Sequence, residues 1–314
     1  MYRIGIDLGG TGIKVGVVDR NGNLAASASV PTRAALGPEQ VLDDVAQCVM
    51  NGLNFAGIGL EECVGIGIGA PGNCDASAGI VRNVHNLGWE SLAVCEMLRQ
   101  RLGLPVFLAN DADCAALGES TYGAAKGCAS ALLITLGTGV GGGYVLDGKI
   151  RSGHRSLGGE FGHICIAMDG EACTCGQRGC WEAYASATAL IRQAKAAAAR
   201  TPDSLLNGSV PDGRSIYAAA AAGDAAAQAV TARYAEYVGI GLVSLINALF
   251  PEMILLGGGI SGAGNALLLP VRDYVRSHSF VRDPLLLPEI RIAALGSDAG
   301  IYGAAALVTE DCRR

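Results

Sequence analysis

The sequence predicts an α/β protein with a duplicated domain, in which helices cover two sheets. Strand patterns and helix patterns alternate along the 314 residues. A glycine-rich β-hairpin also occurs twice, with its tight turn at 8–12 in the first copy and at 137–143 in the second. Each copy leads into a further hairpin turn, Asn21-Gly22 or Asp147-Gly148, of the kind that favours primed turns. Two hairpins of one design, about 130 residues apart, indicate that one domain pattern is repeated.

The strands are predicted from short apolar runs that are bounded by turn residues. The run 63–69, for example, consists largely of apolar residues and glycine and ends in the turn 70–73, which indicates a buried strand. By these signals the expected strands are 3–7, 13–18, 24–30, 63–69, 105–109, 131–136, 144–146, 253–256 and 290–295.

The helices are predicted from helical apolar spacing together with capping residues. Pro38 suits the first turn of a helix, Asp224 can cap a long helix, and Ser297-Asp298 can cap the last one. The expected helices are 39–54, 91–102, 112–120, 184–200, 215–222, 224–249, one that follows the triple-glycine turn 257–261, and 298–308.

Composition and charge exclude several classes of protein. Half of the residues are hydrophobic and 17% are charged, which is typical of compact globular chains. The formal net charge of −6 and the absence of a basic stripe argue against nucleic acid as a partner. No uninterrupted apolar run is long enough to cross a bilayer, so we expect no membrane partner. Scattered cysteines and the lack of a signal peptide ahead of Tyr2 predict a reduced, cytoplasmic location.

A metal site is predicted by four residues that fall within 18 positions, namely His163, Cys173, Cys175 and Cys180. Three thiolates and one imidazole are a donor set that suits Zn²⁺ better than Mg²⁺ or Ca²⁺. Buried core thiols are the alternative, and they fit less well because the intervening residues are polar and rich in glycine. Four protein ligands leave no open position, so we expect the ion to shape a loop and not to perform chemistry.

The two glycine-rich turns also predict phosphate contacts. Each contains Gly-Thr-Gly, at 10–12 and 137–139, and such turns bring backbone N–H groups close to an anion. Glycine in a hairpin often serves geometry alone, so the prediction depends on the turn occurring twice.

Asn110-Asp111 stands where an expected strand ends and a helix begins, which is where ligands gather in α/β sheets. An aspartate there can accept the proton of a substrate hydroxyl. On spacing alone it is equally consistent that Asp111 or Asp113 caps the helix. Phosphoryl transfer requires phosphate cradles, Mg²⁺ and a base that orients the attacking oxygen, and the chain supplies candidates for each except a clear arginine clamp.

Taken together, these motifs resemble the ROK (repressor, open reading frame, kinase) family of sugar kinases, and most closely its bacterial glucokinases. The resemblance extends through nearly the whole chain. It is carried by Asp7-Leu-Gly-Gly-Thr11, Gly69-Ala-Pro-Gly72, Asn86-Leu-Gly-Trp89, Leu108-Ala-Asn-Asp111, Leu136–Gly143, Gly159-Glu-Phe-Gly-His163, Cys173–Glu182, Leu256–Ile260 and Ala293–Gly300.

The resemblance implies the duplicated actin/hexokinase-like (ribonuclease H-like) fold, with two lobes and an interdomain cleft. The small lobe would comprise 1–115 plus 298–314, because the family's last helix crosses back to it. The large lobe would comprise 116–297 and carry the metal loop 160–182.

Residue roles are implied by the same resemblance. Asp111 would be the base that takes the proton from the sugar 6-hydroxyl. The other sugar hydroxyls would be held by Asn86, Asn110, Glu160, His163 and Glu182, with His163 using the ring nitrogen that does not face the zinc. Asp7 would hold Mg²⁺ through water. The nucleotide would contact Gly9, Gly10, Thr11, Lys14, Thr138, Gly139, Gly258 and Gly259. Lys14 fits equally well as a solvated strand residue, and Asn86 as a residue that fixes its own loop.

The resemblance implies a homodimeric glucokinase that uses ATP with Mg²⁺ and holds a structural Zn²⁺. Kinases for N-acetylmannosamine, N-acetylglucosamine or fructose share the scaffold and stay open as alternatives, as does a phosphate donor other than ATP. A ROK-type transcriptional repressor or a sugar sensor fits less well. We expect no DNA-binding helix-turn-helix, because the first strand begins at Arg3, and a sensor would lack the base or the phosphate turns.

Overall fold

The structure is a computed structural model that describes residues 1–84, 86–208 and 211–309. It divides into two compact units. The first unit comprises Met1–Ser130, Gly143–Gly159 and the described part of Ala294–Arg314, and the second comprises Ala131–Gly142 and Glu160–Ala293. This division assigns 116–130 and 143–159 to the first unit, whereas the boundary expected from the sequence assigned them to the large lobe. Residues 310–314 of the expected small lobe lie outside the described residues.

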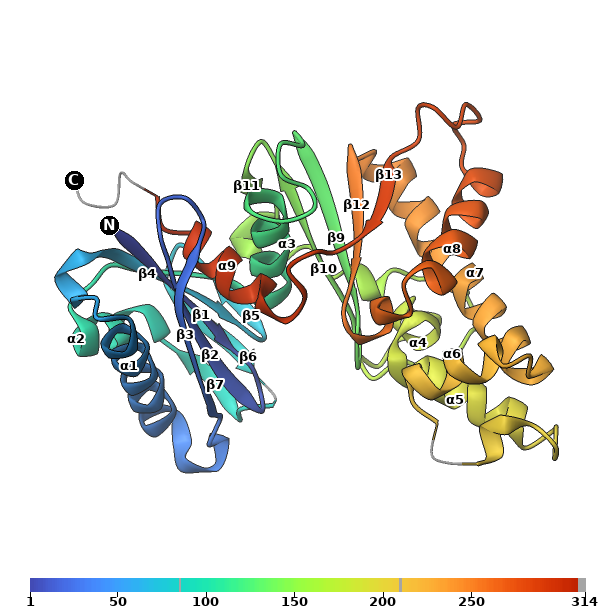
Figure 1. Ribbon diagram of the computed structural model, residues 1–314, viewed down its shortest axis with the longest axis horizontal. Helices are drawn as coiled ribbons and strands as arrows, with labels where there is room; N and C mark the ends of the chain where they lie inside the picture. The colour runs from blue at the N-terminus through green and yellow to red at the C-terminus, as the bar shows by residue number, and fades with distance from the viewer. Residues whose placement is uncertain (85, 209–210, 310–314) are drawn as a thin grey trace. The chain divides into compact units, whose positions relative to one another are not determined.

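The first unit contains a five-stranded sheet in the order β3-β2-β1-β4-β8 (Figure 1). Its strands are β1 (Tyr2–Leu8), β2 (Gly12–Val18), β3 (Leu24–Pro31), β4 (Cys63–Ala70) and β8 (Val106–Asn110). The first three strands are antiparallel, and β1, β4 and β8 are parallel. The unit's helices are α1 (Gly37–Ala56), α2 (Val94–Leu102), α3 (Asp111–Thr121) and α9 (Ala299–Ala306).

The two faces of this sheet are covered differently. Alternate residues of β1, namely Ile4, Ile6 and Leu8, are fully buried in one core with α1 and α2. The opposite face lies against α9, which also packs on α3. Glycine permits this close approach, because a Cβ on Gly5 would lie 1.9 Å from the Ile301 carbonyl oxygen. The sheet is therefore held at a fixed distance from α9 by backbone contact.

The second five-stranded sheet has the order β11-β10-β9-β12-β13. Its strands are β9 (Ser130–Leu136), β10 (Val140–Leu146), β11 (Lys149–Ile150), β12 (Met253–Gly257) and β13 (Glu289–Ile292). An antiparallel set is again followed by parallel neighbours, since β10 pairs antiparallel with β11 while β12 is parallel to both β9 and β13. The predicted duplication is therefore confirmed by the matching strand orders.

The second unit carries the remaining helices, α4 (Glu182–Ala185), α5 (Ala187–Ala198), α6 (Gly213–Ala221), α7 (Ala225–Leu249) and α8 (Asn265–His278). Short 3₁₀ segments lie at η1 (Ala34–Leu36), η2 (Leu60–Glu62), η3 (His154–Ser156), η4 (Phe161–His163), η5 (Leu205–Asn207), η6 (Gly259–Ala263) and η7 (Gly296–Asp298).

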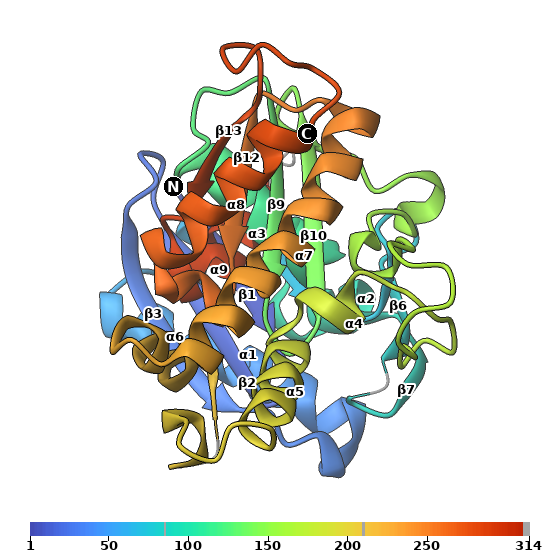
Figure 2. The same cartoon turned by 90° about the vertical axis from the view of Figure 1, so that its right-hand side faces the viewer.

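Helix α7 runs beside α8, as Figure 2 shows, and also packs on α4, α5 and α6. By length and hydropathy α7 alone among the described helices is able to cross a membrane, but half of its apolar window is buried. We therefore assign it as a core helix.

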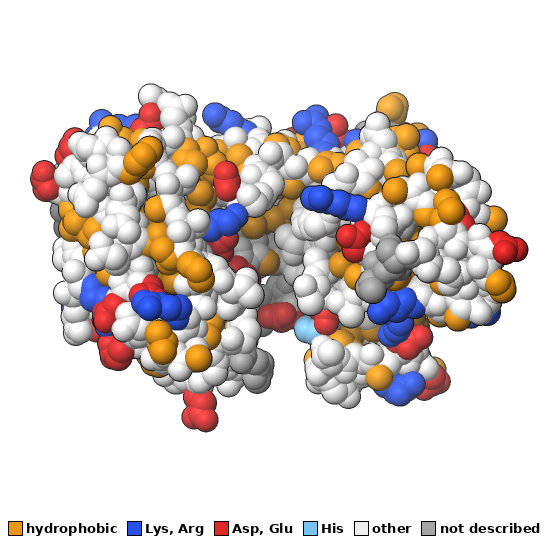
Figure 3. Space-filling model, turned by 60° about the horizontal axis from the view of Figure 1, so that its bottom comes forward, with side chains coloured by type: hydrophobic (Ala, Val, Ile, Leu, Met, Phe, Trp, Pro, Cys, Tyr) orange, Lys and Arg blue, Asp and Glu red, His pale blue; other side chains and the backbone are white. Residues whose placement is uncertain are grey.

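Three expected elements differ from the structure. Residues 73–92, for which no strands are expected, contain a small sheet of β5 (Asn73–Asp75), β6 (Ile80–Val84) and β7 (Trp89–Leu92). The single helix expected at 184–200 is interrupted at Ser186, which caps α5 by accepting from Ala189 N–H. The turn expected at 137–143 ends earlier, because β10 begins at Val140. On the face drawn in Figure 3, acidic and basic side chains are interspersed.

Candidate active site and metal centre

The carboxyl ends of three parallel strands bring Asp7 and Asp111 to one edge of the first sheet. Asp7 on β1 is paired in register with Gly69 on β4, which is paired with Ala109 on β8. Neighbouring strands are about 4.8 Å apart, so the Cα atoms of Asp7 and Ala109 lie about 10 Å apart. Asp111 follows two residues later as the first residue of α3. Both carboxylates therefore lie at the edge where α/β sheets bind ligands.

The environment of Asp7 favours its neutral form in the absence of a cation. Burial, and then the charge of Asp111, raise the pKa of Asp7 to about 6, while Lys14 acts in the opposite direction. A bound cation stabilises the charged form of a carboxylate. A cation should therefore lower the raised pKa of Asp7. The site chemistry of Asp7 therefore suits a hard cation such as Mg²⁺.

The N-cap residue of α3 is Asn110, and Asp111 also accepts a hydrogen bond in the first turn. The Asn110 Oδ1 accepts a hydrogen bond of 2.9 Å from Ala112 N–H, and its Nδ2 donates to the Gly72 carbonyl at 3.3 Å. Asp111 is exposed, and its Oδ1 also accepts from Ala112 N–H, at 2.8 Å. The helix N-terminus thus holds Asp111 in place at the sheet edge, while Asn110 supplies the cap.

The first glycine-rich turn is closed by backbone and side-chain bonds. Gly9 N–H donates to the Gly12 carbonyl at 2.9 Å, and the Thr32 hydroxyl donates to the Gly9 carbonyl at 2.7 Å. A Cβ on Gly10 would lie 2.6 Å from the Asn86 Nδ2, so the Asn86 amide packs directly on this turn. Asn86 is therefore in contact with the first glycine-rich turn, and this contact is not one of the two roles expected for it. Its contact with sugar stays a prediction.

Lys14 lies opposite Asp7 in the β1–β2 pairing. Its Nζ donates to the Ser297 carbonyl at 2.9 Å, just before α9. Lys14 thus links the hairpin to η7. Its phosphate contact also stays a prediction.

The second glycine-rich turn, at Gly137–Gly139, is tied to the start of α5. Ala187 N–H donates to the Gly137 carbonyl at 2.7 Å, and the Thr188 hydroxyl donates to the Thr138 carbonyl at 2.8 Å. Gly258 lies beside the end of β9, since a Cβ on it would approach the Leu136 backbone to 2.6 Å, and its φ is +79°. Only glycine fits there, and it brings the Gly258-Gly259 backbone next to this turn.

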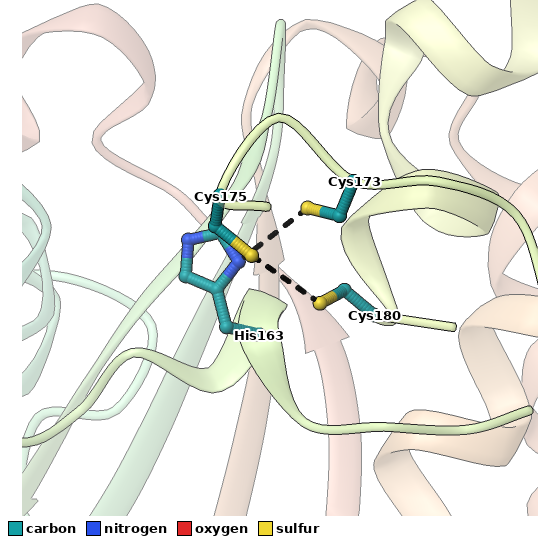
Figure 4. Close-up of side chains that lie close together, drawn as sticks. All are labelled: His163, Cys173, Cys175 and Cys180. Atoms are coloured by element: carbon teal, nitrogen blue, oxygen red, sulfur yellow. Dashed lines mark hydrogen bonds between the residues drawn. The ribbon is translucent and has the colours of Figure 1, made fainter. Parts of the chain in front are cut away.

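The four predicted metal ligands converge, as Figure 4 shows. Their donor atoms all lie within 4.8 Å of one another. The Cys175 and Cys180 sulfurs are 3.6 Å apart, and the His163 Nδ1 is 3.7 Å from the Cys173 sulfur. In a tetrahedral zinc site with usual bond lengths, the S–S separation is about 3.8 Å and the N–S separation about 3.6 Å. These two separations and the donor set fit a Zn²⁺ site.

The imidazole of His163 turns its Nδ1 toward this cluster. Nε2 is then the nitrogen available to another partner, and its contact with sugar stays a prediction. Burial raises the pKa of the Cys180 thiol to about 12, and a backbone hydrogen bond from Gln177 lowers that of Cys175. A bound cation would favour the thiolate of both.

Glu182 connects the metal cluster with the phosphate turn. Its Oε2 accepts from Val140 N–H at 3.0 Å, and its Oε1 lies 3.9 Å from the Cys173 sulfur. A Cβ on Gly139 would lie 2.3 Å from Oε2, so glycine is required for this contact. Glu160 is exposed and precedes η4, and its carbonyl accepts from His163 N–H at 3.0 Å. Both carboxylates thus belong to the segment that the metal would stiffen.

The metal loop is anchored to the helical core by Trp181. This side chain is fully buried, and its Nε1 donates to the Tyr237 carbonyl on α7 at 2.7 Å. It packs on Gly241, where a Cβ would lie 2.0 Å from the indole ring. The cluster is therefore held from two sides, by α7 and by the phosphate turn.

Sequence reasoning did not identify Thr32 and Thr188, whose hydroxyls hold the two glycine-rich turns. Thr188 follows the Ser186 cap closely, and this capping pattern is a signal that the sequence does contain. Thr32 lies 23 positions after its partner Gly9, and no local pattern indicates that pairing.

Comparison with known proteins supports one family. The family model described as ROK family matches residues 3–311. The glucokinase of Halalkalibacterium halodurans is 37% identical, over 98% of this chain and 95% of its own. A ROK hexokinase structure from Thermus thermophilus matches with a TM-score of 0.82 at 37% identity, over 100% of this chain and 99% of that one. A ROK glucokinase structure from Streptomyces griseus, in complex with glucose and AMPPNP, matches with a TM-score of 0.83 at 36% identity, over 98% and 99%. The predicted actin/hexokinase-like fold class is confirmed, and the chain belongs to the ROK family.

Proposed function

We propose that this chain is a glucokinase, which transfers the γ-phosphoryl group of ATP to the 6-hydroxyl of glucose. The full-length similarity to glucokinases, including one solved with glucose and AMPPNP, supports this activity. The structural observation that carries it is the placement of Asp7 and Asp111 at one strand edge, beside a glycine-rich turn. A base, a cation-binding carboxylate and a phosphate cradle are the parts that phosphoryl transfer requires.

In the proposed reaction, Asp111 accepts the proton of the glucose 6-hydroxyl. The 6-oxygen forms a bond to the γ-phosphorus while the bond from that phosphorus to the bridging oxygen of ADP breaks. Glucose 6-phosphate and ADP result, and the proton then leaves Asp111 for solvent. Positioning and charge stabilisation supply most of the acceleration in such reactions.

The nucleotide is assigned to both glycine-rich turns. Gly9, Gly10 and Thr11 would present backbone N–H groups to one end of the triphosphate, and Thr138 and Gly139 to the other phosphates. Gly258 and Gly259 would lie beside the adenosine, and Lys14 would contribute positive charge near Asp7. Asp7 would hold Mg²⁺ through water. When bound, the ion neutralises charge on the phosphate oxygens.

Sugar recognition is assigned to five polar side chains, namely Asn86, Asn110, Glu160, His163 and Glu182. Carboxylates accept hydrogen bonds from sugar hydroxyls, and an imidazole whose other nitrogen binds a metal donates one through its remaining N–H. We assign the metal as structural Zn²⁺ bound by His163, Cys173, Cys175 and Cys180. It would fix the tautomer of His163, so that Nε2 faces the sugar with a defined hydrogen-bonding role. A homodimer in the cytoplasm, acting in glycolysis, completes the proposal, and sedimentation analysis tests the dimer.

The test of the base is Asp111→Asn, which keeps the side chain's shape and removes the proton acceptor. We expect turnover with glucose to fall by about 10²–10⁴-fold, while the affinity for a non-hydrolysable ATP analogue stays within a factor of two or so. Glu96→Gln is the matched control, because Glu96 is a carboxylate in the first turn of another helix of the same unit. Near-normal turnover in Asp111→Asn would refute the assignment.

Substrate identity is tested by ADP release with Mg²⁺, ATP and a panel of sugars. The panel comprises glucose, fructose, N-acetylglucosamine and N-acetylmannosamine, with polyphosphate replacing ATP in a parallel series. We expect the highest kcat/KM with glucose and ATP. A higher value with an N-acetylhexosamine would overturn glucose as the substrate while leaving the kinase assignment in place.

A further inference from the structure

The metal loop contains a fourth thiol that the ligand cluster does not use. Cys165 is free and exposed, and the four clustered donors belong to other residues. It lies directly opposite the ligand Cys180 in an isolated antiparallel β-bridge. Cys180 itself is buried. An exposed thiol is therefore paired, across two short chain segments, with a buried metal ligand.

Two backbone hydrogen bonds define the geometry of this pair. Ile166 N–H donates to the Gly179 carbonyl at 2.8 Å, and Trp181 N–H donates to the Ile164 carbonyl at 2.8 Å. These bonds flank the two cysteines, which therefore form a non-hydrogen-bonded pair. In such pairs the Cα atoms are about 4.5 Å apart and the side chains lie on the same face.

That spacing suits a disulfide, whose Cα atoms are usually roughly 4.4–6.8 Å apart. The Cys165 sulfur already leans toward the opposite segment, since it lies 3.9 Å from the Arg178 carbonyl oxygen. A Cβ on Gly179 would lie 3.2 Å from the same sulfur, so glycine leaves the space between the two segments open. Bond formation would thus require side-chain rotation and no backbone shift.

We propose that Cys165 is an oxidation site that forms a disulfide with Cys180 and expels the metal ion. The proposal rests on the metal centre of the proposed function. Hydrogen peroxide is the oxidant by class. Its O–O bond breaks as the Cys165 sulfur becomes a sulfenic acid, and water leaves. Cys180 then attacks that sulfur, the S–S bond forms, the S–O bond breaks, and a second water leaves. In sum, two thiols and one peroxide give one disulfide and two waters.

Cys165 is attacked first because its electron pairs are not shared with a cation and because it is exposed. The competing product is a disulfide between the ligands Cys175 and Cys180, whose sulfurs are 3.6 Å apart. That product requires oxidation of a metal-bound sulfur. Formation of the Cys165–Cys180 disulfide therefore requires Cys165, whereas formation of the Cys175–Cys180 disulfide does not.

Loss of the ion would change the geometry of the proposed active site through Glu182. This carboxylate lies 3.9 Å from the Cys173 sulfur and holds the Val140 N–H of the phosphate turn. A released ligand segment would free Glu182 to move. Oxidation should therefore raise the KM for glucose, and a reductant together with Zn²⁺ should restore it.

The experiment treats the zinc-loaded full chain with hydrogen peroxide. Peptide mass spectrometry identifies disulfides, and a chromogenic chelator follows zinc release. We expect a linked Cys165–Cys180 peptide, lighter by two hydrogen atoms than the separate peptides, to appear in step with zinc release. Cys165→Ser should keep its zinc before treatment and release it several-fold more slowly. Cys95→Ser is the control, because Cys95 is another incompletely buried free thiol, and it should behave as the parent.

Two results would overturn the proposal. One is a linked Cys175–Cys180 peptide as the main product, and the other is an unchanged rate of zinc release in Cys165→Ser. A chain that binds no zinc before treatment would instead refute the metal centre, and its peptide map would still show whether Cys165 and Cys180 pair.

Discussion

Burial and the charge of Asp111 raise the pKa of the Asp7 carboxyl to about 6, from an ordinary value of 3.8. The folded state therefore binds this proton more tightly than the unfolded state does. Between about pH 4 and pH 6 the free energy of unfolding falls as pH rises, because the folded state must release the proton. Above pH 6 the charged Asp7 destabilises the nucleotide-free fold by about 3 kcal/mol.

Asp7→Asn removes this effect, because the amide carries no charge. We expect the variant to be more stable than the parent at pH 8. The difference should vanish below about pH 3, where Asp7 is protonated in both the folded and the unfolded state. Urea unfolding without Mg²⁺ or nucleotide measures the difference. Equal stability of Asp7→Asn and the parent at pH 8 would show that the charged Asp7 does not destabilise the fold. The same variant should lose kinase activity.

Glu119 is a fully buried carboxylate that holds two distant segments. Its Oε2 accepts from Ala124 N–H at 2.9 Å and its Oε1 from Leu295 N–H at 2.7 Å. Glu119→Ala would leave both donors without their acceptor, at a cost of about 1–3 kcal/mol each. Chemical unfolding measures the loss. Glu236→Ala is the control, because Glu236 forms an exposed ion pair with Arg233 and should cost less than about 1 kcal/mol.

The convergence of side chains was predictable where the residues are close in sequence. The four candidate metal ligands fall within one short segment, so their spacing alone indicated the cluster that the structure shows. The Lys14–Ser297 contact joins residues 283 positions apart. The hydrogen bond between Leu295 and Glu119 joins residues 176 positions apart. Such contacts depend on how the chain folds back, and no local pattern encodes them.

At the scale of elements, the packing of α9 on the first sheet depends on glycine. A Cβ on Gly67 of β4 would lie 1.7 Å from the Ala304 carbonyl oxygen, and a Cβ on Gly303 would lie 1.5 Å from the Cys114 carbonyl oxygen. Both partners are backbone atoms, which cannot rotate away. Any larger residue at Gly67 or Gly303 would therefore displace α9.

Gly67→Ala should cost at least about 3 kcal/mol, the upper part of the usual range for overpacking. Gly52→Ala is its matched control. In the interior of α1 the new methyl group would meet only the Ala28 Cβ, at 3.7 Å, and alanine favours helix over glycine by up to about 1 kcal/mol. In thermal and urea unfolding, the free energy of unfolding should therefore fall for Gly67→Ala and rise for Gly52→Ala. A mild effect of Gly67→Ala would mean that α9 is not seated on β4.

The elements that sequence reasoning missed have identifiable physical causes. Strands β5, β6 and β7 are short, and several of their residues are exposed, so no apolar alternation marks them. In β10, Gly142 and Gly143 look like turn residues but serve packing. A Cβ on Gly142 would lie 2.6 Å from the Leu133 carbonyl oxygen, and one on Gly143 would lie 2.7 Å from the Ala116 Cβ. Glycine frequency alone does not distinguish a bend from a close contact.

For the whole molecule, two units with separate cores predict that metal removal acts locally. Cys175→Ser, or treatment with a strong chelator, should increase hydrogen exchange in 160–182 and weaken glucose binding. The backbone amides of β1 and β4 should keep their protection, because they belong to the other unit. Hydrogen-exchange mass spectrometry checks both regions. Normal glucose affinity in a metal-free variant would refute the structural role of the ion.

The repeated strand order was predictable for the whole chain because both hairpins carry the same turn residues in sequence. The unit boundaries were not, since 143–159 returns to the first unit after β9 has entered the second. That return is accompanied by a hydrogen bond from Asp147 N–H to the Ala129 carbonyl. No local sequence pattern indicates this contact.

The carboxylate of Glu182 touches the sulfur cluster with one oxygen and the Val140 amide with the other. Thermodynamic linkage works equally in both directions. If the proposed zinc ion and nucleotide are coupled through Glu182, a nucleotide that tightens the turn would strengthen the retention of zinc, and bound zinc would strengthen nucleotide binding by the same factor.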